Sequence, residues 1–205
     1  MVAKGYWAQQ EADPKLYRPD HYEIATKLKP VLGAHILTGP IAVRGAEPGD
    51  TLEVRVKAIK LTADWGWSVI RPLRGSLPED FPEFQRWTIP IDRERMTAKL
   101  AWGPTISLQP FFGILATAPR PEYGRISSIE PREFGGNVDC KEYVAGTSVF
   151  LPVFVPGANF SAGDGHAVQG DGEVCLTALE TCLEGTFELV LHKGMKLAMP
   201  RALTP

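Results

Sequence analysis

Aspartate and histidine stand two residues apart at Asp164 and His166, within a segment that also holds four glycines. In an extended backbone, side chains at positions i and i+2 leave the same face, so this carboxylate and this imidazole would converge on one point. Carboxylate oxygens and imidazole nitrogens are ligands of zinc and other divalent metals. The glycines at 163, 165, 170 and 172 permit close approach of the backbone to a ligand. The spacing therefore makes residues 163–173 a candidate metal site.

The same residues have a simpler interpretation as turns. The two Asp-Gly pairs, at 164–165 and 171–172, are also typical of hairpin turns, and the spacing alone leaves both interpretations open. Asp139 follows Gly-Gly-Asn-Val and is equally compatible with an Asx turn. His35 precedes a Thr-Gly-Pro turn at 38–40, but a lone histidine is more often a hydrogen-bonded core or surface residue.

Alternating apolar residues predict the strands that would position these side chains. After a Glu-Pro-Gly-Asp turn, apolar residues at 52, 54, 56 and 58 share one face and charged residues occupy the other, which indicates a half-buried strand. Two further strands are expected at 173–180 and 186–192, separated by Glu184-Gly185. The apolar run 149–155 contains Pro152, which predicts an edge strand or a bulge.

The remaining segments are expected to be a helix and loops. Residues 20–29 indicate a short helix, because Asp20 can cap it and Pro30 would stop it. Residues 64–90 contain several prolines and are expected to be irregular. Trp65 and Trp67 lie there, and large aromatic residues in such a loop more often cover a core than bind a ligand.

Composition limits the class of protein. The chain has 205 residues, of which 44% are hydrophobic and 22% charged, so it is globular and forms one domain or two closely packed lobes. The net charge of -2 argues against a nucleic-acid partner, and no apolar run is long enough to span a membrane. With 20 glycines and 18 prolines spread between short apolar runs, many tight turns between strands are expected. This predicts a mainly β fold, a barrel or sandwich with a short N-terminal helix and long Gly/Pro-rich loops.

Cysteine usage and missing motifs narrow the function. Three cysteines without a Cys-x-x-Cys pair indicate reduced thiols, and the N-terminus lacks the apolar core of a signal peptide, so a cytoplasmic protein is expected. The sequence contains no nucleophile elbow, P-loop or dinucleotide fingerprint, which argues against serine hydrolases and nucleotide-binding enzymes.

A series of motifs from His35 to the C-terminus resembles the acetamidase/formamidase family. The motifs are His-Ile-Leu-Thr-Gly-Pro-Ile from 35, Gly-Ala-Glu-Pro-Gly-Asp-Thr-Leu from 45, Asp-Trp-Gly-Trp from 64, Gly-Gly-Asn-Val-Asp from 135, Leu-Pro-Val-Phe-Val-Pro-Gly-Ala from 151, and Gly-Asp-Gly-His-Ala-Val-Gln-Gly-Asp-Gly-Glu from 163. The resemblance implies metal-dependent hydrolysis of small linear amides to a carboxylate and ammonia, with zinc as the expected metal.

The resemblance also suggests roles for individual residues. Asp139, Asp164 and His166 are the expected metal ligands, with His35 as a fourth candidate. Glu173 is the candidate general base and later proton donor to the departing ammonia. The candidate substrate-binding residues are Trp65, Trp67 and Asn137.

The resemblance also implies a chain that is shortened at both ends. We therefore expect an N-terminal segment at 1–30 and a shortened amidase-like domain at 31–205. An uncovered apolar strand at 149–155 would favour a homodimer or higher homo-oligomer. Two alternatives stay open: a non-catalytic module that binds a small ligand or metal, and a cupin-like metal oxygenase, which the absence of a His-x-His pair disfavours.

Overall fold

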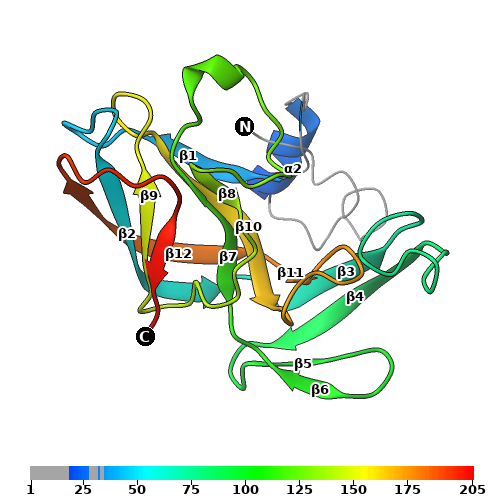
Figure 1. Ribbon diagram of the computed structural model, residues 1–205. Helices are drawn as coiled ribbons and strands as arrows, with labels where there is room; N and C mark the ends of the chain where they lie inside the picture. The colour runs from blue at the N-terminus through cyan, green and yellow to red at the C-terminus, as the bar shows by residue number, and fades with distance from the viewer. Residues whose placement is uncertain (1–18, 28–31, 33–34) are drawn as a thin grey trace.

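The computed structural model describes residues 19–27, 32 and 35–205, which form a mainly β molecule (Figure 1). Helix α2 (Pro19–Lys27) precedes the strands, in the region where the sequence predicts a helix over 20–29; residues 28 and 29 lie outside the described part. Glu23 and Lys27 form an ion pair one helical turn apart. This helix is too short to cross a membrane, and it is the only α-helix in the described ranges.

Thirteen strands form two antiparallel sheets within the described residues. The strands are β1 (Leu37–Ile41), β2 (Thr51–Leu61), β3 (Trp65–Ile70), β4 (Gln85–Asp92), β5 (Thr97–Lys99), β6 (Thr105–Ser107), β7 (Phe111–Ala116), β8 (Gly135–Asn137), β9 (Ser148–Pro152), β10 (Phe160–Val168), β11 (Leu179–Glu180), β12 (Leu183–His192) and β13 (Arg201–Leu203). The large sheet has the order β6-β5-β4-β3-β11-β10-β7-β8, with β1 also paired to β10, and the small sheet has the order β12-β2-β9-β13.

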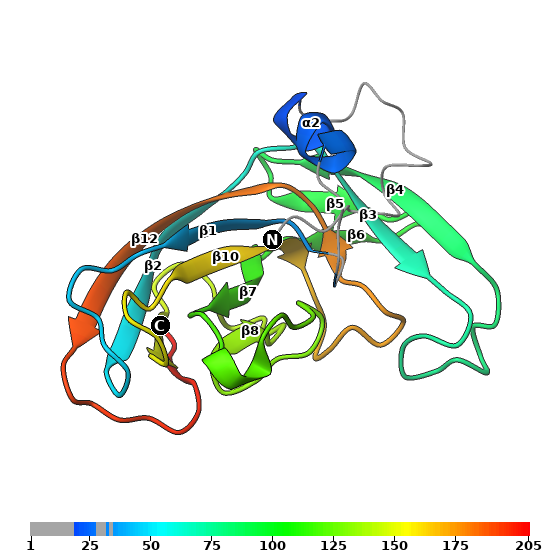
Figure 2. The ribbon, with the colours of Figure 1, turned by 90° about the horizontal axis from the view of Figure 1, so that it is seen from above.

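The main core lies between the two sheets, which makes the fold sandwich-like. The small sheet contributes buried residues from β2 and β9, including Leu52, Val54 and Leu151, and the large sheet contributes Phe112 and Phe160 from β7 and β10. Seen from above, β2 and β12 curve along one side of β7 and β10 (Figure 2). The mainly β prediction is therefore confirmed, and of its two forms the described strands favour the sandwich.

The strand predicted from alternation is confirmed as β2. Its residues Leu52, Val54 and Val56 are buried, whereas Lys57 on the opposite face is exposed. β12 pairs with β2 from Leu183 to His192, so the strand expected at 186–192 is present and longer. The expected break at Glu184-Gly185 is wrong, because both residues lie within β12 and pair with β2.

The predicted edge strand at 149–155 is wrong. β9 lies between β2 and β13, and its residues Val149 and Leu151 are almost fully buried. Pro152 ends the strand, and β13 pairs only as far as Phe150, so the missing N–H of the proline interrupts no ladder on that side. Since β13 of the same chain covers this edge, the apolar run gives no argument for a second subunit.

Two further expectations about strands are wrong. Residues 64–90 are not irregular throughout, because β3 and β4 pair antiparallel from Trp65–Pro90 to Ile70–Gln85. Only Leu179–Glu180 of the predicted strand 173–180 is extended. The preceding chain turns because the Leu176 N–H donates to the Glu173 carbonyl at 3.0 Å and Leu176 has φ of 102°.

Candidate metal centre

His166 lies at the centre of the large sheet and is fully buried. It belongs to β10, where it pairs with Phe111 of β7 on one side and with Glu180 of β11 on the other. The Phe111 ring packs against the imidazole in an edge-on arrangement, with 4.8 Å between ring centroids. The sheet therefore fixes this imidazole from both neighbouring strands.

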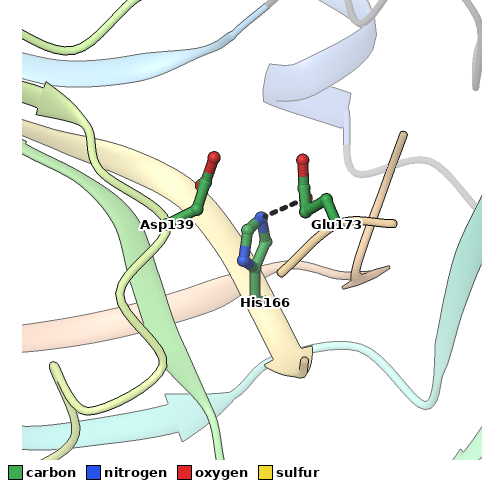
Figure 3. Close-up of side chains that lie close together, drawn as sticks. All are labelled: Asp139, His166 and Glu173. Carbon is green, nitrogen blue, oxygen red and sulfur yellow. Dashed lines mark ion pairs between the residues drawn. The ribbon is translucent and has the colours of Figure 1, made fainter. Parts of the chain in front are cut away.

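Three carboxylates lie close to the Nε2 atom of His166. The distances from Nε2 are 3.3 Å to Asp164 Oδ2, 3.5 Å to Glu173 Oε1 and 3.3 Å to Glu180 Oε1. Asp139 completes the cluster: one donor atom each from Asp139, His166 and Glu173 lies within 4.8 Å of the others. The same holds for Asp164, His166 and Glu180. In Figure 3, Asp139 and Glu173 lie on either side of the His166 ring.

Asp164 lies within β10, so the interpretation of Asp164-Gly165 as a hairpin turn is wrong. Asp164 has φ of 59° and Asp139 has φ of 50°, conformations that are uncommon for residues other than glycine. Such strain costs free energy and persists where surrounding contacts enforce it, often at functional sites. Both residues point their carboxylates at the same place despite lying in different segments.

Gly113 of β7 provides the space in which the cluster assembles. A Cβ atom at this position would lie 3.0 Å from His166 Cε1 and would also collide with Asp164 Oδ2 and Asp139 Oδ1. The Gly113 carbonyl accepts hydrogen bonds from the N–H groups of Val138 and Asp139, at 3.1 and 3.2 Å. Gly113 thus both admits the side chains and anchors the segment that carries Asp139.

Glu173 lies in the turn between β10 and β11 and not at the start of a strand. Its carboxylate and that of Glu180 share one donor, the Ala178 N–H, at 2.8 Å to Glu173 Oε1 and 3.1 Å to Glu180 Oε1. Val69 of β3 donates its N–H to Thr177 Oγ1 at 3.0 Å, which holds this turn against the sheet.

Burial and mutual repulsion dominate the electrostatics of the cluster. Burial and the neighbouring Asp164 raise the pKa of Asp139 to about 7, and burial with Glu180 and Asp139 raises that of Glu173 to about 9. Burial alone would lower the pKa of His166, but the charges of Glu180 and Asp164 raise it well above its usual value. Burial alone would raise the pKa of Asp164, but contact with His166 holds it below its usual range.

His35 stands at the edge of the cluster. Its Nε2 is 4.0 Å from Asp164 Oδ2, and its Nδ1 lies 2.8 Å from Ser128 Oγ. This hydrogen bond orients the ring so that Nε2 faces Asp164. Ser128 was not anticipated, because the sequence separates it from His35 by 93 positions.

The donor set fits a divalent cation. Asp139 Oδ1 and both ring nitrogens of His166 are buried and have no hydrogen-bond partner among the described residues. Buried polar atoms are almost always hydrogen-bonded, so these unpaired atoms call for an additional partner. Carboxylate oxygens and an imidazole nitrogen are suitable ligands for zinc and similar ions, and a cation would offset the repulsion between the carboxylates.

The three expected substrate-binding residues differ in how close they lie to the cluster around His166. Trp67 of β3 pairs directly with Glu180, so its backbone is adjacent to the cluster, whereas the Trp65 carbonyl accepts a hydrogen bond from Thr181 Oγ1. Asn137 ends β8, two residues before Asp139; its Nδ2 donates to the Ile129 carbonyl and its Oδ1 is buried without a partner in the described chain.

Sequence reasoning missed Glu180. It is only 8% exposed, and its carboxylate is as close to His166 Nε2 as that of Asp164. The available signal was a charged residue directly after the apolar pair Ala178-Leu179. A buried carboxylate is rare, but the sequence alone does not show that Glu180 is buried.

Comparisons with known proteins agree with this architecture. The Acetamidase/Formamidase family matches residues 23–128 and 123–202. An acetamidase from Mycolicibacterium smegmatis is 28% identical over 68% of this chain and 49% of its own length. The chain thus spans about half the length of the curated relatives that it matches.

Solved structures show the same fold. A predicted acetamidase/formamidase from the thermophile Thermoanaerobacter tengcongensis has a TM-score of 0.77 and 32% identity, covering 82% of this chain and 54% of that one. A gamma lactamase from Delftia acidovorans has a TM-score of 0.75 and 27% identity, covering 82% and 55%. The family match extends over most of the sequence and includes all the residues of the cluster. This chain therefore belongs to the acetamidase/formamidase family.

Proposed function

We propose that the chain takes part in metal-dependent hydrolysis of the C–N bond of small linear amides such as formamide and acetamide, giving a carboxylate and ammonia. One observation carries the proposal: a fully buried histidine without hydrogen-bond partners in the described residues is surrounded by carboxylates from several segments. Family membership supplies the class of reaction.

The proposed ligands are Asp139, Asp164 and His166, and zinc is the first candidate because it accepts both oxygen and nitrogen ligands. Glu180 joins the set because its Oε1 lies 3.3 Å from His166 Nε2, whereas His35 is a more distant fourth candidate. A divalent cation here supplies Lewis-acid polarisation of the amide carbonyl and lowers the pKa of coordinated water.

Glu173 is the proposed proton carrier. Its side chain is 22% exposed, against 10% for Asp164 and 11% for Glu180, so it is the more accessible of these carboxylates to a substrate. A cation bound beside it would lower the raised pKa of Glu173, so that its carboxylate could accept a proton from the attacking water and return it to the departing ammonia. We further propose that Trp67, Trp65 and Asn137 contact the substrate.

Ammonia release from formamide, acetamide and a small lactam tests the proposal. The protein is stripped with a chelator and assayed before and after addition of zinc, with His166→Ala as the matched variant that lacks the central ligand. We expect zinc to restore ammonia release to the stripped protein and not to the variant. Tight zinc binding without ammonia release from any of these substrates would contradict the catalytic function and leave a metal-binding module.

A further inference from the structure

Asp139 and Glu173 reach the cluster from two separate loops. Asp139 follows β8, and Glu173 lies between β10 and β11, whereas His166 is fixed within the sheet. Their donor atoms lie within 4.8 Å of each other and of His166. Two carboxyl groups held this close disfavour each other's ionisation and do not attract one another, so contacts outside the cluster must hold the two loops together.

Two side-chain contacts join these loops, and we name them together the loop clasp. Gln169 Nε2 donates to the Asp139 carbonyl at 2.8 Å, and Lys141 Nζ donates to Asp171 Oδ1 at 2.6 Å. Gln169 and Asp171 precede Glu173 along the chain, and Lys141 follows Asp139. The loop clasp therefore connects the segments that carry the two carboxylates on either side of His166 (Figure 3).

The two contacts differ in strength. The Asp171 side chain is 95% exposed, and solvent-exposed ion pairs contribute about 0–1 kcal/mol. Gln169 is half-buried, and its bond fixes the carbonyl of the very residue whose carboxylate enters the cluster. The Asp139 N–H is already held by the Gly113 carbonyl, so the bond from Gln169 fixes the next peptide unit and Asp139 is restrained on both sides of its Cα atom.

We propose that Gln169 is a positioning residue, which holds Asp139 at the separation from Glu173 and His166 that one shared cation requires. This inference rests on the proposed metal site. Partners that orient metal ligands in this way typically change metal affinity by about 10–100-fold when they are replaced.

Gln169→Leu separates positioning from general stability. The Oε1 atom of Gln169 is buried and has no hydrogen-bond partner among the described residues, which is unfavourable for the folded state. Leucine has a similar size, loses the hydrogen bond to Asp139 and at the same time removes this unpaired oxygen. The melting temperature should therefore change little, whereas a purely structural role would show itself as a loss of stability.

Zinc titration is the first measurement. We expect Gln169→Leu to weaken zinc binding by about 10–100-fold, while Gln109→Leu, the same change at an exposed position, leaves it unaltered. Asp171→Ala should weaken binding less than about 3-fold. Unchanged zinc affinity in Gln169→Leu would overturn the inference. A loss of zinc affinity in Asp171→Ala as large as that in Gln169→Leu would also overturn it, because the Lys141–Asp171 ion pair would then position Asp139.

Amide hydrogen exchange on the metal-free protein is the second measurement and does not depend on the proposed function. In Gln169→Leu, the amides of Val138 and Asp139 should exchange about 10-fold faster, while those of β7 and β10 keep their rates. Equal exchange in both proteins would overturn the inference. If the native protein binds no zinc, the proposed function fails, and the exchange rates alone decide the role of Gln169.

Discussion

Glu173 differs from Asp164 and Glu180 in its greater exposure, and its pKa of about 9 is raised further than that of Asp139, which is about 7. If it carries the proton, Glu173→Gln should retain zinc and lose turnover by about 10²-fold or more. Metal analysis and ammonia release on this variant are the measurements. A loss of zinc would instead make Glu173 a ligand, and unchanged activity would remove it from the mechanism.

The absence of a side chain at Gly113 leads to a prediction about steric crowding of the metal ligands. A methyl group there would stand 3.0 Å from His166 Cε1 and press on two carboxylates, so Gly113→Ala must displace at least one ligand. We expect zinc affinity to fall at least about 10-fold, in line with the effect of misplaced metal ligands. Gly170→Ala is the matched control, because a Cβ there meets no atom within 4 Å. Equal affinities in the two variants would show that the cluster adjusts without loss.

At the scale of elements, the outer face of the small sheet carries a buried carboxylate. Glu53 of β2 accepts hydrogen bonds from Arg55 Nε at 2.7 Å and Ser148 Oγ at 3.0 Å, and His192 Nε2 lies 2.7 Å away. The hydrogen bond from Arg55 is the largest factor that lowers the pKa of Glu53, to about 2. These contacts join β2 to β9 and β12, so they connect three strands of one sheet.

The lowered pKa of Glu53 predicts how stability depends on pH. A carboxyl group whose pKa falls on folding stabilises the protein fully above its usual pKa, and this contribution disappears as pH falls toward the folded-state value. Glu53→Gln should lose about 1.5–3 kcal/mol at pH 7, the usual range for hydrogen bonds to a charged group, and show a flatter stability profile between pH 5 and 2. Urea unfolding across this range measures both effects. Glu188→Gln, at a more exposed carboxylate, should cost under about 1 kcal/mol; an equal loss would contradict the assignment.

The elements also show what the sequence could reveal. β2 was predictable because the residues of one face are apolar and pack on the core, whereas the other face carries charged residues, which gives a period of two. The position of β9 within its sheet could not be predicted, because Pro152 is typical of an edge strand. The strand that covers β9 is β13, which has only three residues and therefore no recognisable alternation of apolar and polar residues. The turn at 173–178 is held against the sheet by the bond from Val69 to Thr177, and no local pattern encodes a contact between residues so far apart.

The candidate site also contains some residues that the sequence predicts and others that only the fold brings together. Asp164 and His166 were found because they share one strand and their spacing is itself the signal. Glu180 is brought to them by the pairing of β11 with β10, and Gln169 contacts Asp139 across 30 residues. The resemblance to a family supplied Asp139, whose local sequence indicates a turn, and Glu173, whose local sequence indicates the start of a strand. Contacts between loops and pairing between distant strands could not be predicted from the sequence.

At the scale of the whole molecule, metal removal should lower stability. Without a cation, the carboxylates around His166 repel one another in a buried place, and a ligand present at 100 times its Kd adds about 2.7 kcal/mol to the folded state. For a chain of this length, that corresponds to a melting temperature about 5–10 °C lower after chelation. Calorimetry with and without zinc measures the shift, and His166→Ala should show none. An equal shift in both proteins would place the metal elsewhere.

The shared donor at Ala178 has a practical consequence for spectroscopy. One amide proton is directed at both Glu173 and Glu180, whose carboxylates belong to the same cluster. The chemical shift of this proton in a nitrogen-15 correlation spectrum should therefore respond to cation loading, to protonation of either carboxylate and to the arrival of a substrate. A single resonance would then follow each of these events in solution.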